Sequence, residues 1–239
     1  MASESETETE PFWNIETRLS SVLLVLAGFV GAAAYTHSAG YFVTFMTGNT
    51  ERAVIGHFLG DHALAFGALA LIVCFVAGVI VASICRRRWW RNHPHGATVL
   101  ATIALAGASV TERIISTTDH DLGLPPILFV AFAMGALNTS FTKNGEVSIP
   151  ITYVTGTLVK LSQGIERHMA GGTAREWLGY AVQYASFALG GVIGGLIGLV
   201  VNGRDMLYTA VVASALVAAY TWFADPRWVN KDRADAGNR

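Results

Sequence analysis

The sequence has few charged residues. Only 14% of its 239 residues are Asp, Glu, Lys or Arg, whereas 52% are hydrophobic and the mean hydropathy is +0.45. An ordinary globular domain carries about 25% charged residues. The formal net charge of -1 also provides no basic field that would attract a nucleic acid. The composition therefore excludes an ordinary soluble protein and indicates a membrane protein.

Cysteines and enzyme motifs are scarce too. Cys74 and Cys85 are the two cysteines of the chain, and both fall in one apolar run. In a helix they would lie about 16 Å apart, which is too far for a disulfide bond. G-x-S-x-G, H-E-x-x-H, C-x-x-C and G-x-G-x-x-G are absent, and no loop is long enough for a soluble catalytic domain. We therefore expect neither an enzyme nor a bound cofactor or metal.

Six apolar stretches are long enough to cross about 30 Å of hydrocarbon as helices. They are residues 19–38, 62–85, 97–117, 125–142, 176–201 and 205–223. Two further segments, 42–60 and 150–168, are only partly apolar and carry charges such as Glu51 and Glu166. We expect these two to lie in the interface or to enter the membrane and return. Eight spans are the alternative, but they would move the arginine-rich loop after the second stretch to the opposite face.

The basic residues predict the orientation of the chain. The loop after the second apolar stretch contains Arg86, Arg87, Arg88 and Arg91. The loop at 117–124 contains two Asp and no Lys or Arg, so the arginine loop is predicted to be cytoplasmic. Six crossings then place both termini on the cytoplasmic side of a cell membrane, which is the inner or plasma membrane, although Arg52 and Arg204 fall on the outer side. Residues 1–17, acidic and unlike a signal peptide, and 225–239 are expected to be cytoplasmic tails, the first disordered.

A Thr-Gly pair occurs in similar surroundings in each half of the chain. The stretch VTFMTG (43–48) aligns with ITYVTG (151–156) at a shift of 108 residues. The preceding spans also correspond, with Gly28 near Gly135 once one residue of slack is allowed. Because the order of the matches is preserved, an internal repeat explains them better than chance.

The spans that follow the Thr-Gly pairs add a weaker match, FVAGVIVASI (75–84) with ALGGVIGGLI (188–197). Each half contains three crossings, an odd number, so the second half enters the membrane from the opposite face. The sequence thus predicts an all-α integral membrane protein of six transmembrane helices in two inverted three-helix repeats, 18–118 and 124–224. Each repeat has a short interrupted or re-entrant helix after its first span. Inverted repeats of this kind are common in secondary transporters.

The Thr-Gly pairs suit the start of a helix inside the membrane. Glycine permits an unusual φ or a close approach, and threonine can cap a helix. A helix that starts at Thr47 or Thr155 would direct free N–H groups toward an anion or a carbonyl. In the alternative interpretation, Gly48 and Gly156 only let helices pack closely, and the threonines bond to carbonyls of their own helix.

The stretches FVTFMTGNT, AMGALN and ITYVTGTLVKL resemble the signatures of the YoaK-like family of multipass membrane proteins, over roughly residues 20 to 223. The resemblance implies an integral membrane protein with about six helices and no assigned function. In relatives the position of Gly31 is typically acidic, whereas its repeat mate here, Asn138, keeps a polar group. The loss of that carboxylate puts proton or cation coupling at position 31 in doubt.

Two polar residues within the apolar spans are candidates for function. Glu112 lies roughly 7 Å from the outer end of the third span and is a possible coupling carboxylate. The alternative is an interfacial ion pair with Arg113. Asn138 is either a solute-binding amide or the donor of an interhelical hydrogen bond of about 0.6 kcal/mol. The glycines of the fifth span, such as Gly191, serve internal packing or a homodimer.

The sequence predicts a membrane transporter or channel for a small polar or anionic solute. The predicted solute site is lined by Thr47, Gly48, Asn49, Asn138, Thr155, Gly156 and Thr157. The alternative is a non-transporting membrane protein that binds a lipid or another membrane protein. A polar cavity between the Thr-Gly pairs favours transport, and a dry, packed centre favours the binding role.

Overall fold

The computed structural model describes residues 15–38, 40–90, 93, 95–115, 122–143 and 146–237. Their α-helices are α1 (Ile15–Thr36), α2 (Met46–Phe58), α3 (His62–Cys85), α4 (His95–Ile115), α5 (Leu124–Leu137), α6 (Val154–Met169), α7 (Arg175–Gly198) and α8 (Gly203–Gly237). A π-helical turn, η1 (Arg86–Trp90), continues α3, and the short strands β1 (Thr142–Lys143) and β2 (Glu146–Val147) pair between α5 and α6. Residues 1–14 of the predicted N-terminal tail lie outside the described residues. The predicted C-terminal tail continues α8 as far as Gly237.

Five of the described helices are long and apolar enough to cross a membrane. They are Ile15–Thr36, His62–Trp90, His95–Ile115, Trp177–Gly198 and Gly203–Ala224. The predicted fourth span, 125–142, is shorter than expected, because α5 has 14 residues and a length of about 21 Å. The hydroxyl groups of Thr139 and Ser140 donate to the carbonyls of Ala136 (2.9 Å) and Leu137 (2.7 Å), where the helix ends. The chain is therefore an all-helical membrane protein in which α5 by itself does not reach across the hydrocarbon.

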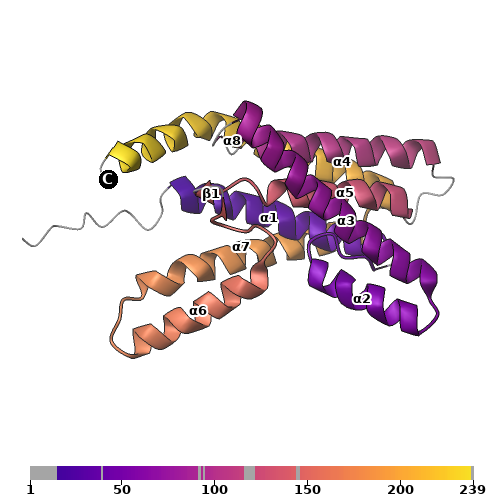
Figure 1. Cartoon of the computed structure of the whole chain (residues 1–239), viewed down its shortest axis with the longest axis horizontal. Coiled ribbons are helices and arrows are strands. Elements are labelled where there is room, and N and C mark those ends of the chain that lie inside the picture. The colour runs from indigo at the N-terminus through magenta and orange to yellow at the C-terminus, as the bar shows by residue number, and fades with distance from the viewer. Residues whose placement is uncertain are drawn as a thin grey trace, which may run out of the picture.

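The first helix of each half occupies the centre of the bundle. α1 and α5 run in opposite directions along the long axis of the molecule (Figure 1). α1 packs against α7 and α8, and α5 packs against α3 and α4. α4 and α8 also pack against each other. Most of the buried hydrophobic core comes from α1 and α5, so each central helix is held by the last two long helices of the other half.

Among the described residues, glycines bring the crossing helices into backbone contact at five positions. At each of them a methyl group added to the glycine would overlap a carbonyl oxygen of the facing helix. The pairs of glycine and carbonyl are Gly28 with Phe187, Gly190 with Val25, Gly194 with Phe29, Gly78 with Phe132 and Gly135 with Phe75. Such contact is typical of membrane helices, where packing must replace the hydrophobic driving force available in water. The α1/α7 crossing and the α5/α3 crossing are built in the same way.

The glycines of α7 are divided between two faces of the helix. Gly190, Gly194 and Gly198 face α1, which confirms the predicted internal packing. Gly191 and Gly195 have no atom of another residue near the place where a side chain would begin. A homodimer through this open face stays a prediction.

The two segments that the sequence did not place, 42–60 and 150–168, each contain a short helix. α2 has 13 residues and α6 has 16, so they are about 20 and 24 Å long and shorter than the hydrocarbon core. Both begin near the middle of the long axis and run toward opposite ends of the molecule (Figure 1). α2 packs against α3, and α6 packs against α7.

Candidate functional site

The Thr-Gly pairs lie in the first turns of α2 and α6, as predicted to within one residue. Phe45 and Tyr153 are the N-cap residues, and neither helix start receives a hydrogen bond from a capping side chain. The prediction that threonine caps these helices is therefore wrong. The first-turn N–H groups remain available to a ligand or to water, which gives both helix starts a partial positive charge.

Each glycine makes room for the aromatic ring of the N-cap residue. A methyl group on Gly48 would overlap the ring of Phe45, and one on Gly156 would overlap the ring of Tyr153. The predicted close approach is thus confirmed, although the neighbour is a ring of the same segment rather than a second helix. Neither glycine has a positive φ.

The threonines near the two helix starts bond mainly within their own helices. The Thr50 hydroxyl donates to the Met46 carbonyl at 3.0 Å, and the Thr157 hydroxyl donates to the Tyr153 carbonyl at 3.4 Å. Thr47 and Thr155 are exposed. The alternative interpretation, in which hydroxyl groups bond back to helix carbonyls, therefore describes Thr50 and Thr157.

At α2, residues 40–45, which we call the covering segment, fold over the helix start. Asn49 is fully buried, and its amide nitrogen donates to the Phe42 carbonyl at 2.6 Å while its oxygen accepts the Phe42 N–H at 3.4 Å. The Arg52 guanidinium donates to the Gly40 carbonyl and lies 4.8 Å from the centroid of the Phe42 ring. The polar groups of Asn49 and Arg52 are thus engaged by the chain itself.

Tyr41 completes this cover by packing onto α3. Its hydroxyl and ring lie so close to Gly67 that a side chain on that glycine would overlap them. The ring of Phe42 stacks on Tyr35 at 5.1 Å and meets Phe45 edge-on at 5.4 Å. Aromatic rings therefore fill the space beside the start of α2.

At α6 the equivalent space is open. A pocket of about 190 Å³ lies between the start of α6, the segment before it and α7. Its lining consists of Ser148, Ile149, Pro150, Tyr153, Gly156, Thr157, Lys160, Tyr180 and Gln183. The Lys160 ammonium lies 5.7 Å from the centroid of the Tyr180 ring. The Ser148 hydroxyl oxygen is buried without a hydrogen-bond partner among the described residues. The described lining of this pocket thus contains hydrogen-bond donors and one positive charge, and no carboxylate.

Asn138 fixes the segment that leads to this pocket. Its side-chain oxygen accepts the Thr152 N–H at 3.0 Å, and its nitrogen donates to the Thr152 hydroxyl at 3.0 Å and to the Met134 carbonyl at 2.8 Å. Asn138 is only 7% exposed. In this structure the amide therefore holds the backbone rather than facing an open space.

The seven predicted solute-binding residues do not share one cavity. Gly156 and Thr157 line the α6 pocket. The first-half residues lie at the start of α2, where Gly48 and Asn49 are buried and Thr47 is exposed. Their role in binding a solute stays a prediction.

Sequence reasoning missed a pair of basic residues. Arg52 and Lys160 occupy equivalent positions at the same shift of 108 residues that aligns the Thr-Gly pairs. Each lies in the second turn of its short helix. Extending the repeat alignment by four residues beyond the glycine would have identified them.

α4 carries the buried Glu112 and a line of hydroxyl groups that bond to α8. Glu112 is only 3% exposed, so it points into the protein and not toward lipid, and it has no polar partner among the described residues. Toward the other end of α4, Thr98 bonds Thr221 at 2.9 Å and Thr102 bonds Ser214 at 2.7 Å. Arg113, the predicted ion-pair partner, lies instead over the ring of Tyr208.

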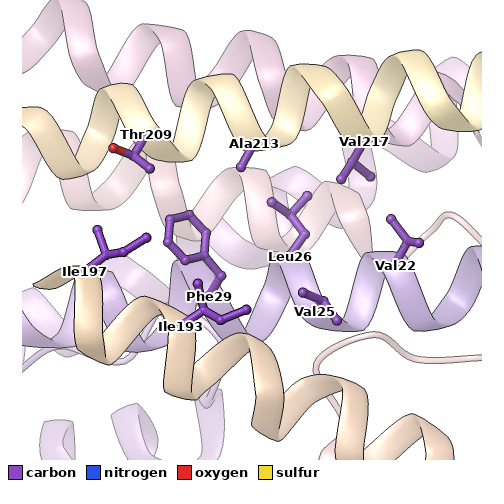
Figure 2. Close-up of a pocket in the computed structure, with 9 residues that line it drawn as sticks. All are labelled: Val22, Val25, Leu26, Phe29, Ile193, Ile197, Thr209, Ala213 and Val217. Atoms are coloured by element: carbon purple, nitrogen blue, oxygen red, sulfur yellow. The ribbon is translucent and has the colours of Figure 1, made fainter.

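Two apolar grooves open on the outside of the bundle. One, of about 320 Å³, lies over α1 between α7 and α8, and Figure 2 shows its side chains, among them Phe29, Ile193 and Val217. The other, of about 560 Å³, lies between α3, α4 and α5 and includes Leu100, Phe129 and Phe132. Their walls are almost entirely carbon, as expected for surfaces that contact acyl chains.

Comparisons with known proteins agree with a membrane family. Residues 19–220 match a family model described as Protein of unknown function (DUF1275). The chain is 29% identical over 220 residues to the UPF0700 transmembrane protein RA0705 of Rhizobium meliloti (strain 1021), with 89% of each chain covered. It is 28% identical to the UPF0700 transmembrane protein YoaK of Bacillus subtilis (strain 168), over 62% of this chain and 66% of that protein. No solved structure matches the chain.

Proposed function

We propose that this chain, which belongs to the family described as Protein of unknown function (DUF1275), is a multipass membrane protein that carries a small polar or anionic solute. In this proposal the two halves form inverted repeats with six crossings. The extended residues between α5 and α6 complete the fourth crossing. Both termini lie in the cytoplasm, and the membrane is the inner or plasma membrane of the cell.

The matched packing of the two halves supports inverted repeats. The same order of helices occurs in α1–α4 and α5–α8, and the first helices run in opposite directions. α1 crosses α7 through Gly28 and Gly190, and α5 crosses α3 through Gly135 and Gly78. Gly28 and Gly135 match in the repeat to within one residue, and Gly78 aligns with Gly191, the neighbour of Gly190. The same type of crossing is therefore used twice, at positions that correspond to within one residue.

The pocket beside α6 is the observation that carries the proposed transport. It joins an uncapped helix start to Lys160, Ser148 and Gln183, within a chain whose other cavities described above are apolar. Non-helical backbone is tolerated at membrane depth where it lines a cavity or is buried in protein. Helix starts directed at solutes are a recurrent feature of transporter sites.

Uptake into vesicles tests this proposal. Purified protein is placed in liposomes, and the uptake of small polar and anionic solutes is compared with that of empty liposomes. Ser148→Ala removes a polar group of the pocket, and Ser162→Ala changes an exposed serine of α6 outside its lining. We expect Ser148→Ala to change the uptake and Ser162→Ala to leave it unaltered. Absence of uptake for every solute would remove the transport function.

The buried Glu112 supports a further part of this proposal, coupling of the solute to protons. An ionisable group inside a membrane bundle is by default a candidate for a proton pathway. Glu112→Gln keeps the shape and removes the titration. If uptake has the same pH dependence in the variant and the wild type, coupling through Glu112 is refuted.

The two apolar grooves favour a second candidate, a protein that binds a lipid without transporting a solute. The groove over α1 has a volume of about 320 Å³ and an apolar contact surface, which suits an acyl chain. A photoactivatable phospholipid would test this, since its acyl chain should label Phe29 and Ile193 (Figure 2). Ala213→Trp, which fills the groove, should abolish the labelling; persistent labelling would locate the lipid elsewhere.

A further inference from the structure

Arg52 and Lys160 have equivalent positions but different surroundings. Each lies four residues after the glycine of its Thr-Gly pair, on a short helix whose start has no side-chain cap. The Arg52 guanidinium donates to the Gly40 carbonyl and lies over the Phe42 ring. Lys160 lies over Tyr180 at the edge of an open pocket.

The lining of the open pocket selects for negative charge. The helix start and Lys160 contribute positive potential, and Ser148 and Gln183 contribute hydrogen-bond donors. No Asp or Glu is among the described residues that line the pocket. The Ser148 hydroxyl oxygen is buried and has no hydrogen-bond partner among the described residues, so no bond within that part of the chain competes for its proton. A small anion such as an oxyanion or a carboxylate matches this set, whereas a cation would meet repulsion.

The difference between the halves follows from substitutions in the repeat. Tyr41 and Phe42 correspond to Ile149 and Pro150. Proline has no N–H group, so the bond that the Phe42 N–H donates to the Asn49 oxygen has no counterpart at Pro150. Thr157 stands at the position equivalent to Asn49, so the amide that donates to the Phe42 carbonyl is absent too. Isoleucine has no hydroxyl or ring with which to reach the neighbouring helix. The covering segment therefore closes the first site, and its counterpart leaves the second site open.

We propose that Lys160 and Arg52 are the anion-binding cations of two equivalent sites, one open and one closed by the covering segment, residues 40–45. This proposal rests on the function proposed above and specifies its solute as a small anion. When the covering segment leaves the start of α2, Arg52 exchanges the Gly40 carbonyl and the Phe42 ring for a bound anion. The aromatic cover thus acts as an internal competitor for the first site.

The open site is tested with full-length protein purified in a maltoside detergent, which carries no phosphate. Thermal unfolding is followed with inorganic phosphate, sulfate and acetate, and in a separate arm with phosphatidylglycerol. We expect at least one free anion to raise Tm. Lys160→Gln should raise the half-saturating anion concentration about tenfold or more, because a charge-assisted contact is lost. Lys160→Arg should retain binding, and Arg167→Gln, an equal change of charge in the last turn of α6, should behave as wild type. The proposal would be overturned if only phosphatidylglycerol raised Tm, or if no anion raised it.

The closed site is tested by counting bound anions. Phe42→Ala removes the ring that covers Arg52, and Gly67→Ala displaces Tyr41 without altering a proposed ligand. Equilibrium dialysis with the anion identified above should give one bound anion per wild-type chain and two in either variant. Arg52→Gln added to either variant should return the number to one. A count of one in both opened variants would overturn the second site.

Uptake measurements separate this proposal from the proposed function. If anion binding depends on Lys160 but no uptake into liposomes is seen, the proposed anion sites are supported and the proposed transport function is refuted. If uptake is unchanged in Lys160→Gln and Arg52→Gln, the transport function is supported and the proposed anion sites are refuted.

Discussion

The glycine crossing of α1 and α7 gives a sharp test of the packing. A methyl group on Gly190 would overlap the Val25 carbonyl oxygen and lie 2.9 Å from the Phe29 nitrogen. Both neighbours are backbone atoms, so no side chain can rotate away, and the helices must separate along their contact. We therefore expect Gly190→Ala to destabilise the protein.

The size of this effect follows from a comparison with the next residue. Overpacking of a tight interface costs about 1–3 kcal/mol. At Gly191 an added methyl group meets no atom, so Gly191→Ala should gain the helix propensity of alanine, up to about 1 kcal/mol. For a chain of this size, a difference of about 1–3 kcal/mol corresponds to roughly 2–12 °C in Tm.

The assay is thermal unfolding of the two variants in the same detergent. Gly190→Ala should melt several degrees below the wild type, and Gly191→Ala at or above it. Gly78→Ala, which overlaps the Phe132 carbonyl at the α3/α5 crossing, should lose a similar amount if the two crossings are equivalent. Equal melting of the Gly190 and Gly191 variants would refute the assigned faces of α7.

Three further predictions concern the polar contacts and the topology. Asn138→Ala removes the acceptor of the partly buried Thr152 N–H, so the free energy of unfolding should fall by about 1–3 kcal/mol, and an unchanged unfolding curve would contradict its structural role. In a double-mutant cycle of Thr102→Val and Ser214→Ala, the coupling energy should be about 0.6 kcal/mol, and no coupling would show that the bond does not contribute. Single cysteines at Trp89 and Glu146, in a chain without its native cysteines, should react with an impermeant reagent from the same side of the membrane; reaction from opposite sides would refute the inverted repeats.

The starts of α2 and α6 could be predicted from the sequence to within one residue. In an apolar chain, Thr-Gly interrupts the pattern of a continuous span, and the repetition of the interruption made it recognisable. The close approach at Gly48 and Gly156 was also predictable, because glycine is favoured where neighbouring atoms leave no room for a side chain. The neighbour itself was not, since the ring of Phe45 returns to Gly48 only through the particular conformation of the N-cap residue.

The choice of packing partners could not be read from the sequence. α3, for example, is apolar around its whole circumference, so its hydrophobic residues do not indicate which face meets α5. The glycines of α7 presented the same difficulty, because Gly190 and Gly191 differ only in which helix face they occupy. The contact of Tyr41 with Gly67 also lies outside any local pattern, since it joins a loop to the following helix.

The position of the polar groups bears on the choice between transport and lipid binding. The centre between α1 and α5 is apolar and packed, which by itself would favour the binding role. The donors of the proposed site lie to one side of this centre, at the start of α6, while the equivalent groups of α2 are covered by Tyr41 and Phe42. A continuous polar path through the protein therefore requires the first half to open. Under the proposed function, variants that weaken the aromatic cover at Arg52 should therefore increase solute uptake before they alter the fold.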